Sequence, residues 1–253
     1  MDKLYAQSLK GWRGEVGMLC PMAGMYREWE VLAPHGIRFS HAVLGAPANT
    51  DIEGLKKMDE AIEDEAKKLN IGMKKDLICL GCTSGSFIGG KGYDKQIIER
   101  IEKASGSPAT TTTTCVLELF KDMGIKTMSL VGPYIDSIFD EEVKFFKAHN
   151  IETLYVGALG LLEAYKLWDY YYDPYACYTL VKQAAEATPE ADCVFVTCMM
   201  SPIMAVIDTL EQEIQKPVIS SCSATLYGIL KELGIPDQIP HYGQALIRER
   251  LFI

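Results

Sequence analysis

Two short apolar segments, each beginning at an aspartate and ending at a cysteine, constrain the fold of this chain most. The first, D-L-I-C-L-G-C, ends at Cys82, and the second, D-C-V-F-V-T-C, ends at Cys198. Short runs of apolar and β-branched residues are typical of buried parallel strands. Open α/β sheets bind ligands just beyond the carboxyl ends of such strands. The match therefore predicts one cleft with a cysteine on each wall.

Two further pairs of segments repeat in the same order along the chain. V-G-M-L-C-P at 16–21 matches M-S-L-V-G-P at 128–133. The segment 108–124 likewise matches 217–234. Three matches in one order indicate an internal duplication. The alternative is an ordinary doubly wound fold in which the halves have no functional pairing.

Strand-like and helix-like segments alternate along the chain, which predicts parallel sheets with right-handed crossovers. We expect an α/β fold of two similar Rossmann-like lobes, related by a pseudo-two-fold axis, with the active site in the cleft between them. The lobes are predicted to span 1–120 and 121–234, with 235–253 packing back on the first. Strands are expected at about 15–20, 37–44, 76–82, 108–112, 126–132, 151–157, 192–198 and 216–220, and helices at about 25–33, 51–69, 93–104, 113–123, 137–149, 173–187, 202–215 and 222–233.

Composition narrows the class of protein. The 253 residues are 48% hydrophobic, enough for a large core, and carry a formal net charge of -9. An acidic chain without a basic stripe is a poor nucleic-acid binder. No apolar run has transmembrane length, and the N-terminus does not resemble a signal peptide. We expect a cytoplasmic protein with no nucleic-acid or membrane partner, and a homodimer as the commonest oligomer.

The eight cysteines of a chain without an export signal are expected to be reduced thiols. Cys79 and Cys82 form a C-x-x-C, but no second C-x-x-C and no nearby histidine accompany it, so no metal site is predicted. Cys79, Cys177 and Cys193 are expected to be small core residues. Neither a G-x-G-x-x-G after the first strand nor a G-x-x-x-x-G-K-[ST] is present, so no nucleotide cofactor is predicted.

The loops after the two matched strands carry groups suited to chemistry on a carboxylate. Cys82 is followed by Thr83, Ser84 and a glycine, which suit a carboxylate or a developing enolate. Cys198 precedes Pro202, which fits the first turn of a helix, so we expect the helix dipole to lower the pKa of the thiol. Two thiols facing one carbon can act as base and acid, or one can add to an activated C=C bond.

Other candidate residues lie at the ends of further strands. Tyr134 follows the strand that repeats the first, where its phenol either donates to a carboxylate or packs at a helix start. Ser221 ends another strand and is expected to line the cleft. The adjacent Cys222 is expected to line the cleft as well rather than to react.

Two loops offer less specific signals. Pro21, Ala23 and Gly24 belong to a small-residue loop that provides backbone donors and is expected to contact substrate. The segment 167–178 is dense in aromatic residues. It is predicted either to pack at a helix start or subunit interface, or to form a wall or lid over the cleft.

Taken together, these motifs resemble the aspartate/glutamate racemase superfamily, and within it the branch of maleate cis-trans isomerases and arylmalonate decarboxylases. The similarity runs over nearly the whole chain. It is carried by G-C-T-S-G-S-F-I-G-G (81–90), V-G-P-Y (131–134), V-T-C (196–198) and K-P-V-I-S-S (216–221). The resemblance implies an enzyme that needs no cofactor and acts on a small carboxylate or dicarboxylate.

The resemblance also implies roles for particular residues. Cys82 and Cys198 look like the paired catalytic thiols. The groups implied to hold a substrate carboxylate as its enediolate forms are Thr83, Ser84, Tyr134 and the backbone N–H of Met199. In the isomerases, the first thiol adds to maleate, the resulting single bond rotates, and the thiol leaves to give fumarate. In the decarboxylases the first thiol is absent, and the second protonates the enediolate left after loss of carbon dioxide.

The chain mixes features of the two activities. It has Cys82, unlike typical decarboxylases, yet Gly24 stands where maleate isomerases carry an asparagine. The leading prediction is a two-cysteine isomerase or racemase of a small (di)carboxylate, similar to maleate cis-trans isomerase. The alternatives are an arylmalonate-type decarboxylase, with Cys198 as proton donor, and a catalytically silent carboxylate-binding protein.

Overall fold

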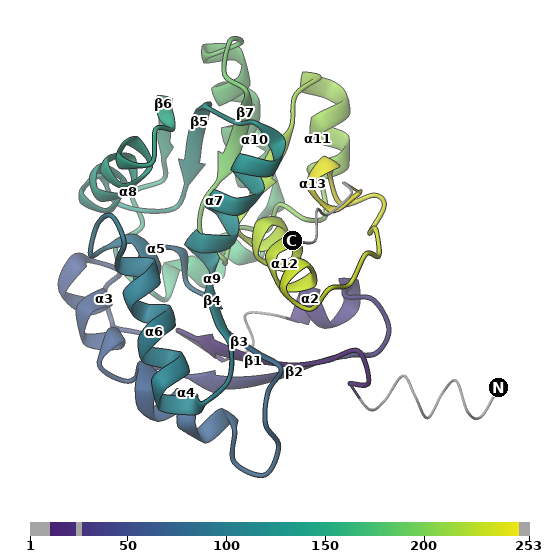
Figure 1. Cartoon of the computed structure of the whole chain (residues 1–253). Helices are drawn as coiled ribbons and strands as arrows, with labels where there is room; N and C mark the ends of the chain where they lie inside the picture. The colour runs from purple at the N-terminus through teal and green to yellow at the C-terminus, as the bar shows by residue number, and fades with distance from the viewer. Residues whose placement is uncertain (1–10, 24–26, 248–253) are drawn as a thin grey trace.

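The strands of this chain form two parallel sheets with the same strand order (Figure 1). The computed structural model describes residues 11–23 and 27–247. In these residues the first sheet has the order β2-β1-β3-β4, and the second has the order β6-β5-β7-β8. The strands are β1 (Gly14–Cys20), β2 (Ile37–Val43), β3 (Leu77–Leu80), β4 (Ala109–Thr111), β5 (Thr127–Gly132), β6 (Glu152–Ala158), β7 (Cys193–Val196) and β8 (Val218–Ser220).

Every predicted strand is present, and the predicted two-lobed α/β fold is confirmed. The central strands β1, β3, β5 and β7 carry an unbroken run of buried residues. Such burial on both faces is expected for parallel strands covered by helices. Because β3 and β7 hold the same place in their sheets, the loops that follow them occupy equivalent positions.

Helices cover both sheets and depart from the predictions at a few points. They are α2 (Arg27–Leu32), α3 (Ile52–Asp59), α4 (Ile62–Leu69), α5 (Thr83–Phe87), α6 (Tyr93–Ser105), α7 (Thr112–Met123), α8 (Asp136–Ala148), α9 (Lys166–Tyr171), α10 (Pro174–Ala187), α11 (Ile207–Ile214), α12 (Ser221–Glu232) and α13 (Gln244–Ile247). The sequence did not predict α5, α9 and α13, which are all short. The predicted helix 202–215 starts later, at Ile207.

The predicted helix 51–69 is broken into α3 and α4. At the break, the Arg100 guanidinium donates to the backbone carbonyl of Asp59 at 3.1 Å and to its carboxylate at 2.8 Å. The same guanidinium also bonds the carboxylate of Glu63. A helix-terminal carbonyl needs a partner from outside the helix, and here Arg100 supplies it. The long-range ion pair therefore marks the end of α3, which sequence periodicity does not reveal.

The helices α7 and α12, which follow the last strand of each sheet, pack against each other where the lobes meet. On this contact, the Asp122 carboxylate accepts from Tyr227 at 2.8 Å and from Lys231 at 2.7 Å. The predicted lobe boundary at 120/121 falls within α7 and stays a prediction. The C-terminal segment touches both lobes, because Asp237 pairs with Arg13 while the N–H of Gln244 donates to Glu211.

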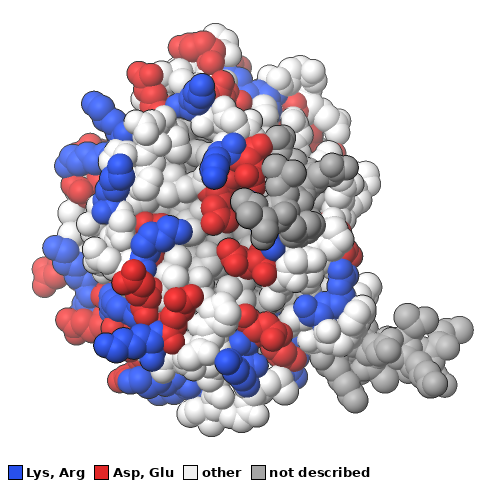
Figure 2. Space-filling view, in the orientation of Figure 1, with Lys and Arg blue, Asp and Glu red and all other residues white. Residues whose placement is uncertain are grey.

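Acidic and basic side chains are interspersed over the face shown in Figure 2, with no continuous basic area. This distribution agrees with the acidic net charge of the chain. Within 11–23 and 27–247, no helix has the length and apolar character needed to cross a lipid bilayer.

The contact between α7 and α12 depends on a glycine. A Cβ atom on Gly228 would lie 2.3 Å from the Sγ of Cys115, far inside van der Waals contact. We expect Gly228→Ala to lower the free energy of unfolding by about 1–2 kcal/mol, because overpacking outweighs the helix propensity gained. Urea denaturation measures the change. The exposed Glu232→Ala on the same helix is the control and should stay within about 0.5 kcal/mol of wild type. An unchanged stability of Gly228→Ala would contradict this packing.

Candidate active site

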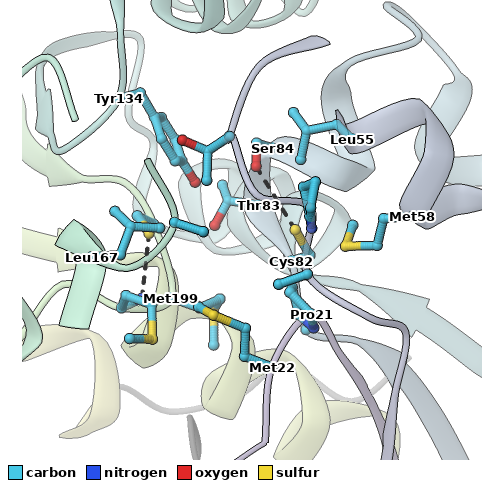
Figure 3. Close-up of a pocket in the computed structure, with 17 residues that line it drawn as sticks. Pro21, Met22, Leu55, Met58, Cys82, Thr83, Ser84, Tyr134, Leu167 and Met199 are labelled. Atoms are coloured by element: carbon cyan, nitrogen blue, oxygen red, sulfur yellow. Dashed lines mark hydrogen bonds between the residues drawn. The ribbon is translucent and has the colours of Figure 1, made fainter. Parts of the chain in front are cut away.

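One pocket lies between the lobes, at the carboxyl ends of the central strands (Figure 3). Both predicted thiols line it. Its walls are almost entirely apolar, and none of the described side chains that line it is charged. The lining residues are Pro21, Met22, Ala46, Pro47, Thr50, Leu55, Met58, Gly81, Cys82, Thr83, Ser84, Tyr134, Ala164, Leu167, Cys198, Met199 and Met200.

Most of the residues predicted for the site therefore share this pocket, although their catalytic roles stay predictions. Of the described residues predicted for the site, Ala23 and Ser221 do not line it. Ala23 is exposed, and Gly24 lies outside the described residues. Ser221 is fully buried behind the pocket wall, where its Oγ accepts a hydrogen bond from Thr83 at 2.8 Å. Ser221 thus contacts a lining residue rather than the cavity.

Cys82 caps the short helix α5. Its backbone is extended, and its Sγ accepts a hydrogen bond from the Gly85 N–H at 3.3 Å. The Ser84 hydroxyl lies 3.8 Å from the same sulfur (Figure 3). Burial raises the pKa of the thiol, while the Gly85 N–H and Ser84 oppose that rise by stabilising the thiolate. The loop after β3 therefore supplies the thiolate with specific donors.

Cys198 has a different environment, and the prediction that a helix follows it directly is wrong. The chain forms a turn at Cys198–Met200, and Cys198 itself has a left-handed φ of 76°. The Ser201 N–H bonds back to the Cys198 carbonyl at 3.1 Å, and the Met200 N–H donates to the Cys198 Sγ at 3.4 Å. These local bonds replace the first turn of the predicted helix. Left-handed backbone in a residue other than glycine is concentrated at functional sites.

The prediction that the Cys198 pKa is lowered is wrong for the same reason. No helix starts at this thiol, so the favourable dipole is missing. Burial raises the pKa of Cys198 to about 12, against the opposing hydrogen bonds of the Met200 N–H and the Tyr134 phenol. At neutral pH Cys198 is therefore a protonated thiol, suited to giving a proton rather than to attacking.

Three hydroxyl groups converge beside the thiols. Figure 3 shows the side chains of Thr83, Ser84 and Tyr134 directed into the same part of the pocket. Burial, with the nearby thiols Cys198 and Cys82, holds the pKa of Tyr134 well above its ordinary value. Its phenol thus stays protonated and can donate a hydrogen bond. Because Thr83 gives its hydroxyl hydrogen to Ser221, Ser84 and Tyr134 are the two of these hydroxyls that can stabilise a carboxylate or an enediolate as donors.

Beneath the pocket, the first turns of α7 and α12 join the lobes. The Thr225 hydroxyl donates to that of Thr112 at 3.2 Å. Cys222 donates its thiol hydrogen to the Met199 carbonyl at 3.2 Å and does not line the cavity, so its predicted lining position is wrong. The hydrogen bond from Cys222 instead orients the Met199 peptide from behind.

Above the pocket, two loops form a roof that bridges the lobes. The Thr50 N–H donates to the Leu162 carbonyl at 2.8 Å, and the Ala164 N–H donates to the Ala48 carbonyl at 2.9 Å. A short antiparallel bridge between Asn49 and Glu163 lies between these bonds. The Thr50 hydroxyl also donates to the Leu161 and Leu162 carbonyls. The roof is therefore held mainly by main-chain hydrogen bonds between the segment after β2 and the segment after β6, with Thr50 adding side-chain bonds.

Sequence analysis missed the apolar part of the pocket. Leu55 and Met58 lie on α3, and their three-residue spacing is that of any core-facing helix stripe. Leu167 begins the aromatic segment, for which we predicted either packing at a helix start or interface, or a wall over the cleft. Different residues of the segment fit each prediction. Leu167 lines the pocket and Tyr170 packs behind it, donating to Ser201 at 3.2 Å, while Tyr172 is exposed. No group of three or more potential metal ligands occurs in the part of the chain that the structure describes.

The two matched lobes and the shared thiol pocket define the class of protein, and comparison with known proteins identifies the family. A family model described as arylmalonate decarboxylase matches residues 16–246. The chain therefore belongs to the arylmalonate decarboxylase family, which confirms the predicted branch.

Individual relatives carry two different names. A maleate isomerase of Geobacillus stearothermophilus is 22% identical over 91% of this chain and 96% of that protein. An arylmalonate decarboxylase of Bordetella bronchiseptica is 24% identical over 72% of this chain and 75% of that protein. A solved mutant of the Nocardia farcinica maleate cis-trans isomerase, with a covalently bound succinylcysteine intermediate, has 20% identity and a TM-score of 0.82 over 92% of this chain and 98% of that one. In that relative, a cysteine thus carries the covalent intermediate.

The unequal thiol environments predict unequal reactivity. Iodoacetamide should alkylate Cys82 faster than Cys198, and both rates should still rise with pH between about 7 and about 9, because alkylation follows the thiolate fraction. Peptide mass spectrometry measures each site separately. The fully buried Cys79 and Cys193, on the central strands, are internal controls and should react last. A plateau for Cys198 near neutral pH would contradict the raised pKa.

Proposed function

We propose that this protein is a cofactor-independent isomerase of a small unsaturated carboxylate or dicarboxylate, with Cys82 as nucleophile and Cys198 as proton donor. The observation that carries the proposal is the pair of unequal thiols in one pocket. Burial raises the pKa of both thiols, to about 12 at Cys198, while the Gly85 N–H and the Ser84 hydroxyl oppose that rise at Cys82. The homodimer and the cytoplasmic location predicted from the sequence stay predictions.

The proposed reaction needs only the groups in the pocket. The Cys82 thiolate forms a C–S bond with one carbon of the C=C bond, and the π electrons move into the adjacent carboxylate to give an enediolate. The remaining C–C single bond rotates. The electrons then return, the C=C bond re-forms, and the C–S bond breaks to release the thiolate. Atoms and charge are therefore conserved over the cycle. Cys198 can protonate the carbanionic carbon next to the carboxylate and take the same proton back before the C–S bond breaks.

The hydroxyl groups account for binding of the carboxylate. Ser84 and Tyr134 can each donate a hydrogen bond, whereas the single hydroxyl hydrogen of Thr83 goes to Ser221. The developing enediolate accepts such bonds more strongly than the ground-state carboxylate does. None of the described side chains that line the pocket is charged, so the proposed binding uses hydrogen bonds from these hydroxyls. Each hydrogen bond is stronger in the low dielectric of an apolar pocket than it would be in water.

A second candidate, decarboxylation of a substituted malonate, is favoured by the apolar lining. Leu55, Met58 and Leu167 form a surface that suits an apolar substituent rather than a second carboxylate. In that reaction a C–C bond breaks, carbon dioxide leaves, and Cys198 gives its proton to the resulting enediolate. Cys82 has no required step in this scheme.

Proton NMR in D2O distinguishes the two candidates. We expect fumarate to form from maleate or a substituted analogue. Aspartate and glutamate are tested for loss of the α-proton signal, and phenylmalonate is tested for a deuterated phenylacetate product. Phenylacetate formation without isomerisation would replace the isomerase proposal by the decarboxylase one.

Cysteine variants test the assignment of roles. If the protein is an isomerase, Cys82→Ser and Cys198→Ser should each lower kcat by at least about 100-fold, the usual contribution of a positioned acid–base or nucleophilic group. The matched control is Cys222→Ser, whose buried residue contacts the Met199 carbonyl rather than the cavity and should cost far less. Full activity of Cys82→Ser with loss in Cys198→Ser would favour decarboxylation, and full activity of both would defeat the thiol mechanism.

A further inference from the structure

A buried carboxyl group without an ionic partner lies behind the Cys198 wall of the pocket. Glu142 is on α8, which lies against β6 and α5 (Figure 1), and its side chain is 0% exposed. No basic side chain of the described residues forms an ion pair with it. Buried carboxylates without a cation are costly and rare, so such a group calls for a reason.

Glu142 makes a single hydrogen bond through its side chain. Its Oε1 accepts from the Thr197 hydroxyl at 2.7 Å, while its Oε2 is buried and has no hydrogen-bond partner among the described residues. Burial raises the pKa of Glu142 to about 8, with the Thr197 hydrogen bond acting in the opposite direction. At neutral pH the group is therefore largely a neutral carboxylic acid.

Thr197 connects this acid to the reacting thiol, since it directly precedes Cys198. The Thr197 N–H donates to the Val131 carbonyl at 2.9 Å, and its own carbonyl accepts from Ser201 at 2.6 Å. A Cβ on Gly132 would lie 2.6 Å from the Thr197 methyl, so the strand next to it also packs tightly. Thr197 is thus held on all sides at the point where the chain turns into the left-handed conformation of Cys198.

The charge state of Glu142 affects the pKa of two groups that line the pocket. An ionised Glu142 raises the pKa of both Cys198, after β7, and Tyr134, after β5. A charge on Cys82, which caps α5, likewise raises the pKa of Cys198 and of Tyr134. The residues of α5 itself are not titratable, and β6 contributes Glu152 and Tyr155. The other charged residues of α8 are Asp136, Asp140, Glu141, Lys144 and Lys147, and Glu142 is the one that is fully buried.

We propose that Glu142 is a positioning residue: as a neutral acid it anchors Thr197, which fixes the Cys198 thiol, and it keeps negative charge out of the wall behind that thiol and Tyr134. The inference rests on the proposed function in that Cys198 is a reacting group. A carboxylate at this place would repel the negative charge that develops on the substrate, the thiolate or the enediolate.

The pH profile tests the neutral acid. In the wild type, log(kcat/KM) should rise with pH as thiolate forms and should break near pH 8, where Glu142 ionises. In Glu142→Gln, which is permanently neutral and nearly isosteric, the break should disappear. The two enzymes should be similar near neutral pH and differ by about tenfold one pH unit above the break. The control Glu141→Gln removes the same charge from the neighbouring, partly exposed residue and should keep the break.

A second measurement does not depend on turnover. Above pH 8, iodoacetamide should alkylate Cys198 faster in Glu142→Gln than in wild type, because removing the carboxylate lowers the pKa of the thiol. Alkylation of Cys79 should be unchanged. Faster alkylation without turnover of any substrate would defeat the proposed function but support this inference. An unchanged Cys198 rate together with a retained pH break would overturn the inference, even in an active enzyme.

Thr197 variants separate positioning from bulk stability and remain informative if Glu142→Gln does not fold. Thr197→Val removes the donor and keeps the shape, so kcat should fall about tenfold while KM changes little, as expected for a displaced reacting group. Thr197→Ser keeps the hydroxyl and should restore most of the wild-type kcat. A wild-type kcat in Thr197→Val would show that the link from Glu142 to Cys198 has no catalytic effect.

Discussion

The two thiols share one pocket because buried hydroxyl groups join the lobes beneath it. Thr83 of the first lobe donates to Ser221, and Thr225 donates to Thr112 across the same junction. A buried hydroxyl left without a partner costs about 1–3 kcal/mol, so sliding one lobe against the other would leave several such groups unsatisfied. The junction therefore fixes the position of the loop after β3 relative to the loop after β7, and with it the separation of the two thiols.

Within this frame, a duplicated fold supports two chemically different cysteines. Cys82 ends its strand in an extended conformation and starts a short helix, so a backbone N–H points at its sulfur. Cys198 ends the equivalent strand in a tight left-handed turn with the buried acid Glu142 behind it. The strands set where both thiols lie, whereas the few residues after each strand set what each thiol can do. Symmetry of the backbone thus coexists with two different thiol environments, which the proposed roles of nucleophile and proton donor require.

The parts of the structure that could be predicted are those with a local pattern in the sequence. Each buried strand is a short apolar run, and the paired Asp-to-Cys segments indicate where two of them end. The turn at Cys198 could not be predicted, because Pro202 suits both a helix start and the loop that is actually present. The apolar wall at Leu55 and Met58 has the spacing of an ordinary core stripe. Glu142 stands in a helix with several acidic residues, and only the tertiary packing distinguishes the one that is buried.

The roof of the pocket has a consequence for how substrate preference can evolve. The bonds at Thr50 and Ala164 join main-chain atoms, which every residue except proline provides in full. Apart from Thr50, whose hydroxyl donates to the Leu161 and Leu162 carbonyls, side chains in these two segments can therefore be exchanged without losing these bonds. Some of them, such as Ala46 and Pro47, face the ligand space. The hydrogen bonds beneath the pocket, at the start of α7 and α12, are the opposite case. They are made by side-chain hydroxyls, which cannot be replaced freely. Drift in the roof can thus change which substrates fit the cavity while the hydrogen bonds beneath it stay the same.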